Sequence, residues 1–338
     1  MGITVLWYLG GALIKYYQAL NPPPLPNPTV DFGLLPKINF PASASRPKLI
    51  LELPTGGIPS FVDRMRVYSQ PIKRSTFTDS EKAIETAAAL GFLFKPEQKS
   101  ESNYVWTNQD QLNSKLDMNI INGHFVLTRQ WQNNPAIASM ASFSSDKAVI
   151  MDIENYLSRV GLLNADIVGV EKATYLKDEG GRLATALSLS DADFVQLDLF
   201  RKNMDEIDPE SKAKEIVASY PFYRSNPSRG LIRVIASGSK TLSDKIISLD
   251  FSYNKIDYTK NGTYPIKTGE EAWAELEKGG GFVFTGESSL PEVKIRRVFL
   301  GYYDADISTG YAMPVYIFLG DQGFTAYVSA VNEALIKK

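Results

Sequence analysis

The chain has 338 residues, of which 44% are hydrophobic and 22% are charged, a balance typical of a soluble folded protein with two or three compact units. Its 36 Lys and Arg residues against 38 Asp and Glu residues leave a net charge of −2, which gives no reason to expect a polyanionic partner such as nucleic acid. The absence of cysteine excludes disulfide bonds, thiolate zinc sites and thiol catalysis.

Residues 1–20 are predicted to form a membrane-anchor helix. Ile3 to Ile14 is apolar throughout, which is about two-thirds of the ~20 residues that a membrane span needs. Lys15 can extend its amine to the headgroups, while Tyr16 and Tyr17 suit the membrane interface. No basic segment precedes the run and no cleavage motif follows it, so a cleaved signal peptide is disfavoured. A buried or surface-lying amphipathic helix is the alternative.

Residues 21–47 are predicted to form a proline-rich stalk. Such a density of proline favours the extended polyproline II conformation, which acts as a semi-rigid spacer. An apolar run, a stalk and a globular body together indicate a membrane-tethered domain on the extracytoplasmic side, in a bacterial envelope. A ligand for a proline-binding adaptor is disfavoured because no basic residues flank the stretch. The eight prolines are Pro22, Pro23, Pro24, Pro26, Pro28, Pro36, Pro41 and Pro47.

The body is predicted to begin with two units, residues 48–142 and 143–262. A helix over 79–90, with Thr78 or Asp79 as its cap, is expected in the first unit and precedes a short antiparallel meander. In the second unit, a helix over 146–160 carries an apolar stripe and precedes further strands.

The third unit, residues 263–338, has the clearest pattern. A helix over 269–278 is expected to be capped by Thr268, whose hydroxyl can accept a hydrogen bond from the first turn. Strands are predicted over 293–303, 311–319 and 324–330, where β-branched and aromatic residues are concentrated. Because Pro314 has no N–H group, its strand is expected to lie at a sheet edge or to begin near that residue.

The three helices start alike and each precedes antiparallel strands, which indicates a degenerate repeat of helix plus meander. The predicted fold class is therefore α+β, built from tandem helix-plus-antiparallel-sheet units behind the hydrophobic helix and the proline-rich stalk. The helix starts are Ser80-Glu81-Lys82-Ala83, Ser145-Asp146-Lys147-Ala148 and Gly269-Glu270-Glu271-Ala272.

The last unit resembles PepSY-like domains, and more narrowly the extracytoplasmic YycH/YycI-type regulators of sensor kinases. The resemblance rests on Tyr264-Pro265-Ile266, the Glu270-Glu271-Ala272-Trp273 helix start and the strand Tyr311 to Phe318, and it covers mainly residues 264–331. It implies a membrane-anchored regulatory or binding module without catalysis. The stalk and the segment 203–229 depart from that family, so a kinase partner does not transfer.

Few residues suggest a catalytic or metal-binding site. His124 is the one imidazole and lies just after the Asn122-Gly123 turn, so an exposed strand position is expected. Asp304 and Asp306 could form a weak calcium site, but Thr309 and Val315 stand where a calcium loop of the EF-hand type needs Gly and Glu. A hairpin turn is therefore preferred for residues 304–310.

Acidic side chains also crowd two neighbouring segments, where a carboxylate pair could serve glycoside hydrolysis. Solvated loop positions are the preferred interpretation. These residues are Asp191, Asp193, Asp198, Asp205, Glu206, Asp208 and Glu210.

Tyrosine is abundant in the third unit. Tyrosines aligned on an exposed sheet face would form a surface for binding a partner, because each offers a large ring with a polar tip. The candidate partner-binding residues are Tyr302, Tyr311, Tyr316 and Tyr327.

The sequence thus predicts a non-enzymatic, membrane-anchored binding or regulatory module that acts on an envelope protein or sensor and uses no cofactor. A structural surface or assembly protein is the alternative from another class. A carboxylate-dependent hydrolase is the remote one.

Overall fold

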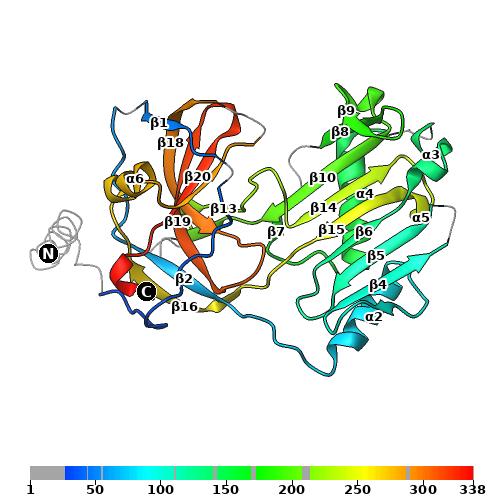
Figure 1. Ribbon diagram of the computed structural model, residues 1–338, viewed down its shortest axis with the longest axis horizontal. Coiled ribbons are helices and arrows are strands. Elements are labelled where there is room, and N and C mark those ends of the chain that lie inside the picture. The colour runs from blue at the N-terminus through cyan, green and yellow to red at the C-terminus, as the bar shows by residue number, and fades with distance from the viewer. Residues whose placement is uncertain are drawn as a thin grey trace, which may run out of the picture.

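The computed structural model describes residues 27–43, 45–54, 56–109, 112–139, 143–168, 173–207, 214–286 and 290–337 (Figure 1). The predicted anchor, residues 1–20, lies outside this part of the chain. Among the described residues, no helix is both long and apolar enough to cross a bilayer. The helices are α2 (Asp79–Ala89), α3 (Ala136–Ser139), α4 (Asp146–Arg159), α5 (Leu242–Lys245) and α6 (Gly269–Glu277), with 3-10 turns at η1 (Trp131–Asn133), η2 (Leu189–Asp191), η3 (Asp321–Gly323) and η4 (Glu333–Leu335).

The protein is mostly β, with 39% of the described residues in strands and 18% in helices. The predicted α+β arrangement of tandem helix-plus-sheet units is therefore wrong. The helices are not each followed by a separate sheet. Strands from distant parts of the chain instead combine into one eight-stranded sheet, one ten-stranded sheet and a small hairpin (Figure 1). The hairpin consists of β11 (Met204–Ile207) and β12 (Ile216–Tyr220).

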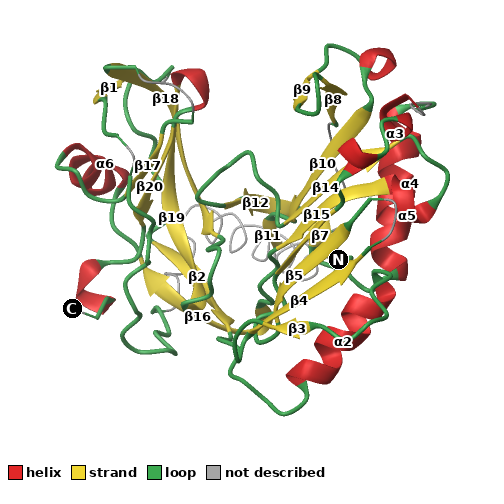
Figure 2. Ribbon diagram, turned by 45° about the vertical axis from the view of Figure 1, so that its right-hand side comes forward, coloured by secondary structure: helices red, strands yellow, loops and turns green. Residues whose placement is uncertain are grey.

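The ten-stranded sheet is antiparallel and has the order β3-β4-β5-β6-β15-β14-β10-β8-β9, with β7 also paired to β10. Helices α2 and α4 cover one face of it (Figure 2). A row of residues facing each other across neighbouring strands is buried under them, including Trp106, Leu116, Leu127, Leu249 and Val234. The strands are β3 (Glu97–Gln98), β4 (Asn103–Asn108), β5 (Ser114–Asn119), β6 (Phe125–Thr128), β7 (Ile167–Val168), β8 (Thr174–Asp178), β9 (Leu183–Thr185), β10 (Phe194–Arg201), β14 (Ile232–Ser237) and β15 (Ile246–Phe251).

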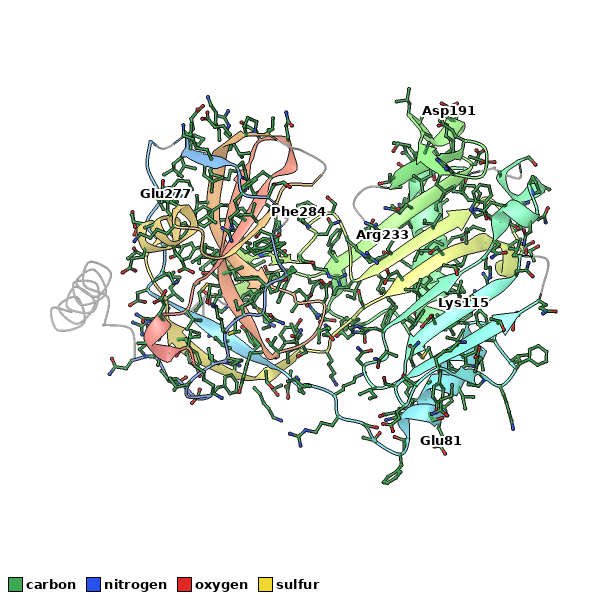
Figure 3. All side chains as sticks on the ribbon, viewed as in Figure 1. Glu81, Lys115, Asp191, Arg233, Glu277 and Phe284 are labelled. Carbon is green, nitrogen blue, oxygen red and sulfur yellow. The ribbon has the colours of Figure 1, made fainter. Side chains whose placement is uncertain are left out.

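The opposite face of the ten-stranded sheet is polar in part, and elsewhere on it Phe194 and Ile247 are buried against Trp131 and Ile137. Alternate residues point there because side chains change sides at every strand position. Lys115 and Arg233, both labelled in Figure 3, belong to this face. Arg233 donates to Asp198 of the neighbouring strand over 2.8 Å, and Lys115 pairs with Asp117 at 3.3 Å. The charges of this face thus largely pair with one another.

The eight-stranded sheet has the order β1-β18-β19-β2-β16, to which β13, β17 and β20 add further pairs. Both of its faces are buried. Helix α6 contributes Ala272 and Leu276 to one face, while Leu35 and Ile38, which precede the first strand, pack on the other. The strands are β1 (Lys48–Leu51), β2 (Arg64–Gln70), β13 (Phe222–Tyr223), β16 (Asp257–Pro265), β17 (Phe282–Phe284), β18 (Glu292–Tyr303), β19 (Gly310–Gly320) and β20 (Thr325–Ser329).

The predicted stalk is not a free spacer over residues 27–43. Leu35 is fully buried, and its amide donates to the carbonyl of Leu335 over 2.8 Å. The ring of Phe40 stacks on Phe282 and meets Tyr303 edge-on at 4.9 Å. Apolar residues between the prolines drive this packing, because they cover the face of the eight-stranded sheet that would otherwise meet water.

The predicted boundaries at residues 142 and 262 do not follow the sheets. Strand β2, within the predicted first unit, pairs with β16 and β19 from the second and third. Strands β14 and β15, which follow the β11–β13 segment, return to the ten-stranded sheet beside β10 and β6. The chain therefore passes between the two sheets several times.

Strand β19 is central rather than an edge strand, so the prediction from Pro314 is wrong. On one side β19 pairs with β18, and on the other it pairs with β2 over 310–312 and with β20 over 315–319. Pro314 lies between the part of β19 that pairs with β2 and the part that pairs with β20. The missing N–H group therefore costs no ladder hydrogen bond there, which explains why proline is tolerated.

A buried polar cluster joins the two sheets at the end of β10. The Arg201 side chain is fully buried and donates to Asp304 over 2.8 Å, to Asp166, and to the carbonyl of Asn254 over 2.7 Å. Burial alone would lower the pKa of Arg201, but the carboxylates of Asp304 and Asp166 raise it. The hydroxyl of Tyr258, from the eight-stranded sheet, also donates to Asp166 over 2.7 Å. We call these residues the Arg201 junction.

Candidate functional site

A groove of about 1050 Å³ lies beside the C-terminal end of α6. One wall is the segment 37–43, and the other is the C-terminal segment from Val331 to Lys337. Ser329, at the end of β20, also lines it. We call this hollow the α6 groove.

Helix α6 is held firmly at its start. The Thr268 hydroxyl accepts from the amide of Glu271 over 3.2 Å, and the Glu271 carboxylate accepts from the amide of Thr268 over 2.7 Å. This reciprocal capping box confirms the predicted cap at Thr268. At the other end, Arg46 donates to the carbonyls of Gly280 and Gly281, so it ties the segment before β1 to the end of the helix.

Lys267 lines the α6 groove. Its side chain is 8% exposed, and its amine is 2.5 Å from Glu275 and 3.9 Å from Glu333. Its backbone is fixed as well, because its amide donates to Ala330 and its carbonyl accepts from the Tyr316 hydroxyl over 2.7 Å. A second hollow of about 530 Å³ shares Lys267, Glu275 and Glu333, so these residues connect the two.

The α6 groove has an excess of positive charge. Four basic side chains line it, and two acidic ones, Glu275 and Glu333, lie among them. Within the described chain, neither Lys37 nor Lys337 has a carboxylate within ion-pair distance, and both are exposed. The Oγ atom of Ser329 is buried and has no hydrogen-bond partner among the described residues. The basic residues are Lys37, Arg46, Lys267 and Lys337.

The rest of the lining is apolar and offers unpaired backbone groups. Ile38, Phe40 and Ile336 supply apolar surface. Among the described residues, the amides of Lys37, Asn39 and Ala42 donate no backbone hydrogen bond. An extended, negatively charged chain could therefore pair with these amides and place its carboxylates near Lys37 and Lys337.

The tyrosines predicted to bind a partner do not form an exposed surface. Tyr302, Tyr316 and Tyr327 are buried in the core of the eight-stranded sheet. Their hydroxyls donate to the backbone carbonyls of Arg66, Lys267 and Arg224, respectively. Tyr311 is half-buried, and its ring packs on Phe32 at 4.9 Å. Tyrosine serves here as a core residue whose polar tip is satisfied internally.

The structure also argues against calcium binding at Asp304 and Asp306. Asp304 is buried and its carboxylate accepts from Arg201, while Asp306 accepts from Arg224 and from Ser225. A guanidinium at each carboxylate takes the place that a cation would need. Among the described residues, no group of three or more His, Asp or Glu side chains is arranged to hold a metal ion.

Asp193 and Asp198, two of the acidic residues proposed for hydrolysis, are bound to separate partners. Asp193 accepts from the amide of Asp178, and Asp198 accepts from Arg233 and from the amide of Gly230. Asp208 and Glu210 lie outside the described residues.

His124 is half-buried rather than exposed, and its Nε2 atom lies 3.1 Å from Oδ1 of Asn254. Burial lowers the pKa of His124, and the hydrogen bond with Asn254 offsets part of this effect. We therefore expect the imidazole to titrate below 6.5 in the folded state. Because the chain has one histidine, a proton NMR titration reports this pKa without ambiguity.

The same shift predicts a loss of stability in mild acid. The unfolded chain takes up a proton near pH 6.5, where folded His124 stays neutral, so the free energy of unfolding falls as pH drops below that value. Urea unfolding at pH 7.0 and 5.5 should show the decrease, and His124→Gln should reduce it. An imidazole pKa at or above its unfolded value would contradict this prediction.

Comparison with known proteins assigns the chain to no family. No protein-family model matches it, and no curated protein matches it. Among solved structures, an uncharacterized protein from Eubacterium rectale is similar over 79% of this chain and 82% of its own, with 12% sequence identity and a TM-score of 0.37. A likeness this weak supports no conclusion about fold or function. The resemblance to PepSY-like and YycH/YycI-type proteins therefore stays a prediction.

The α6 groove was missed in the sequence because one of its walls lies in the predicted stalk. A signal was present, since Leu35, Ile38 and Phe40 place large apolar side chains between the prolines. In a solvated spacer these side chains would be exposed to water, which is unfavourable. Nothing in the sequence indicated that Lys267 would line a groove, because a lysine before a helix is common and its burial depends on distant strands.

Proposed function

We propose that this protein is a non-enzymatic binding module that holds an extended, acidic segment of an envelope protein partner in the α6 groove. The observation that carries the proposal is the charge of the groove, where Lys37 and Lys337 stand exposed on opposite walls without acidic partners in the described chain. Apolar side chains and unpaired amides between them suit an extended peptide backbone.

The proposed setting is the extracytoplasmic side of a membrane, with residues 1–20 as the anchor. Its support is the sequence alone: the apolar run, the interfacial tyrosines and the absence of cysteine. The wall of the α6 groove begins at Lys37, shortly after the predicted anchor. A partner in or near the same membrane could therefore reach it.

The first test is charge reversal in the groove. Lys37→Glu with Lys337→Glu is expected to weaken binding of a fluorescein-labelled hexaglutamate peptide by about tenfold, since each exposed ion pair contributes about 0.5–1 kcal/mol. Lys82→Glu with Lys95→Glu, which changes two exposed lysines on the other sheet's side, is the matched control. Fluorescence anisotropy at low and high salt measures both. Equal affinity of the two double variants would contradict the proposal.

The second test identifies the partner in cells. A photo-crosslinking amino acid at Asn39, an exposed position of the groove wall, is expected to trap a defined protein. The same amino acid at Glu81 on α2 is the control. The Asn39 adduct should disappear when Lys37 and Lys337 are reversed. Identical adducts from both positions would mean that the groove has no partner of its own.

A further inference from the structure

One edge of β18 is covered at its two ends and open between them. The other edge pairs with β19 from Ile295 to Tyr303, so β1 and β13 both lie on the side away from β19. There β1 pairs with residues 292–295 and β13 pairs with residues 302–303. Among the described residues, no strand pairs with residues 296–301 on this side. We call this stretch the β18 gap.

The backbone groups of Val298 and Leu300 point into the β18 gap. In an antiparallel pair, alternate residues turn both N–H and C=O toward the partner strand, and the residues between them turn both away. Tyr302 lies opposite Pro314, which has no N–H group, and its own amide donates to Pro221 on the far side over 2.8 Å. Val298 and Leu300 lie at even steps from Tyr302, so they too turn away from β19. Among the described residues, neither their amides nor their carbonyls have a hydrogen-bond partner.

The neighbouring strands cannot close the β18 gap. Pro221, directly before β13, has no N–H group to offer the carbonyl of Leu300, so the parallel ladder ends there. At the other end, the last backbone hydrogen bond runs from the amide of Glu52 to the carbonyl of Ile295 over 3.0 Å. Val298 and Leu300 are only 8% and 5% exposed, and buried backbone groups normally have partners. The unpaired groups are therefore suited to a strand from another molecule.

A hollow of about 540 Å³ lies along the β18 gap. Phe61, Tyr220 and Leu300 line it from the core on the face that α6 covers. Tyr223 and Phe299 line it from the core on the opposite face, with their ring centroids 6.0 Å apart. A strand in the hollow would therefore meet apolar surface on both of its faces. The hollow shares no lining residue with the α6 groove.

Arg297 is the one charged side chain among the described residues that line the hollow. It is exposed, and its guanidinium lies 5.4 Å from the centroid of Phe299. Within the described chain it has no carboxylate at ion-pair distance, whereas its neighbour Arg296 pairs with Glu52 and Asp321. A segment that enters the β18 gap can therefore place a carboxylate at Arg297.

We propose that the β18 gap accepts an extended segment of a partner protein as an added strand, with apolar side chains on both faces and an acidic residue at Arg297. The strands of this chain are already paired in its own sheets, so among the described residues a second copy has no free segment of this kind. The proposal is independent of the acidic ligand in the α6 groove.

The test uses the full chain in a mild detergent and the fluorescein-labelled peptide Glu-Val-Thr-Val-Thr-Val-Glu, which carries a carboxylate at either end for Arg297. We expect saturable binding by fluorescence anisotropy. N-methylation of two valine amides removes donors from one edge of the peptide, and N-methylation of two threonine amides removes them from the other. One of these two peptides should bind at least tenfold more weakly than the other. Equal affinities, or no binding of the unmodified peptide, would overturn strand pairing.

Val62→Trp, which fills the hollow from an exposed position, is expected to abolish binding of the peptide. Val217→Trp is the matched control, because it makes the same change at an exposed residue of β12 outside the hollow. Lys37→Glu with Lys337→Glu, which changes only the α6 groove, should also leave this binding unchanged. Equal binding by the Val62→Trp and Val217→Trp variants would overturn the site.

Two further measurements test the chemistry and the source of the strand. Arg297→Gln should weaken binding about threefold, and should have no effect on a peptide with glutamine in place of its glutamates. An equal loss for both peptides would overturn the ion pair. Analytical ultracentrifugation then examines the full chain alone. Self-association that Val62→Trp abolishes would assign the β18 gap to a second copy, and would overturn its assignment to a different protein.

Discussion

Replacing Arg201 by leucine is expected to lower the free energy of unfolding by about 3–5 kcal/mol, because the change leaves buried carboxylates without their cation. Asp304 is 1% exposed and accepts from Arg201 over 2.8 Å, and Asp166 accepts from it too. Asp166 keeps the hydroxyls of Tyr253 and Tyr258, but Asp304 loses its ion pair. Denaturation by urea measures the loss.

Two variants make this prediction specific. Lys48→Ala, which removes an exposed ion pair with Glu292, should cost less than about 1 kcal/mol. Arg201→Met combined with Asp304→Leu should recover part of the lost stability, because the second change removes the unpaired charge. If Arg201→Leu alone cost as little as Lys48→Ala, the Arg201 junction would not hold the two sheets together.

Gly281→Ala is expected to destabilise the protein by about 2–5 kcal/mol, the sum of a left-handed backbone and a steric conflict. Gly281 has φ of +67°, and a Cβ atom there would lie 2.2 Å from the carbonyl oxygen of Tyr327. This oxygen belongs to a central strand, β20, and cannot move without disturbing its pairing with β17 and β19. Thermal or urea unfolding of the variant tests the effect.

Gly279→Ala separates the two causes. Gly279 has φ of +87°, but no atom lies within 4 Å of the position of its Cβ. Its replacement should therefore cost about 1–2 kcal/mol, from the backbone alone. Equal losses for both variants would show that the strand next to Gly281 yields to the added methyl group.

The local elements were predictable because their signals are local. The helices near 79–90, 146–160 and 269–278 formed with ends shifted by one residue, since apolar periodicity and glycine stops act within a few residues. The cap at Thr268 formed as well. The cap expected at Thr78 did not: its side chain makes no capping hydrogen bond, and Asp79 instead accepts from Thr76.

Strand pairing was not predictable from the sequence, and the predicted fold class was wrong for this reason. A strand's hydrophobic pattern shows which face is buried but not which strand lies beside it. Thus β15 alternates between buried apolar and less buried polar residues from Ile247 to Phe251, but nothing in this pattern indicates β6 as its neighbour. Three of the four tyrosines chosen as a binding surface failed for the same reason, because a sheet with two covered faces buries what a sheet with one open face would display.

The parallel pair of β1 and β18 joins residues that are 244 positions apart, such as Lys48 and Glu292. During synthesis on the ribosome, β1 and β2 must therefore wait for their partners until most of the chain has emerged. Contacts of such long range slow folding. We expect refolding of this protein to be slow, and its early strands to be most vulnerable to aggregation before β16–β19 arrive.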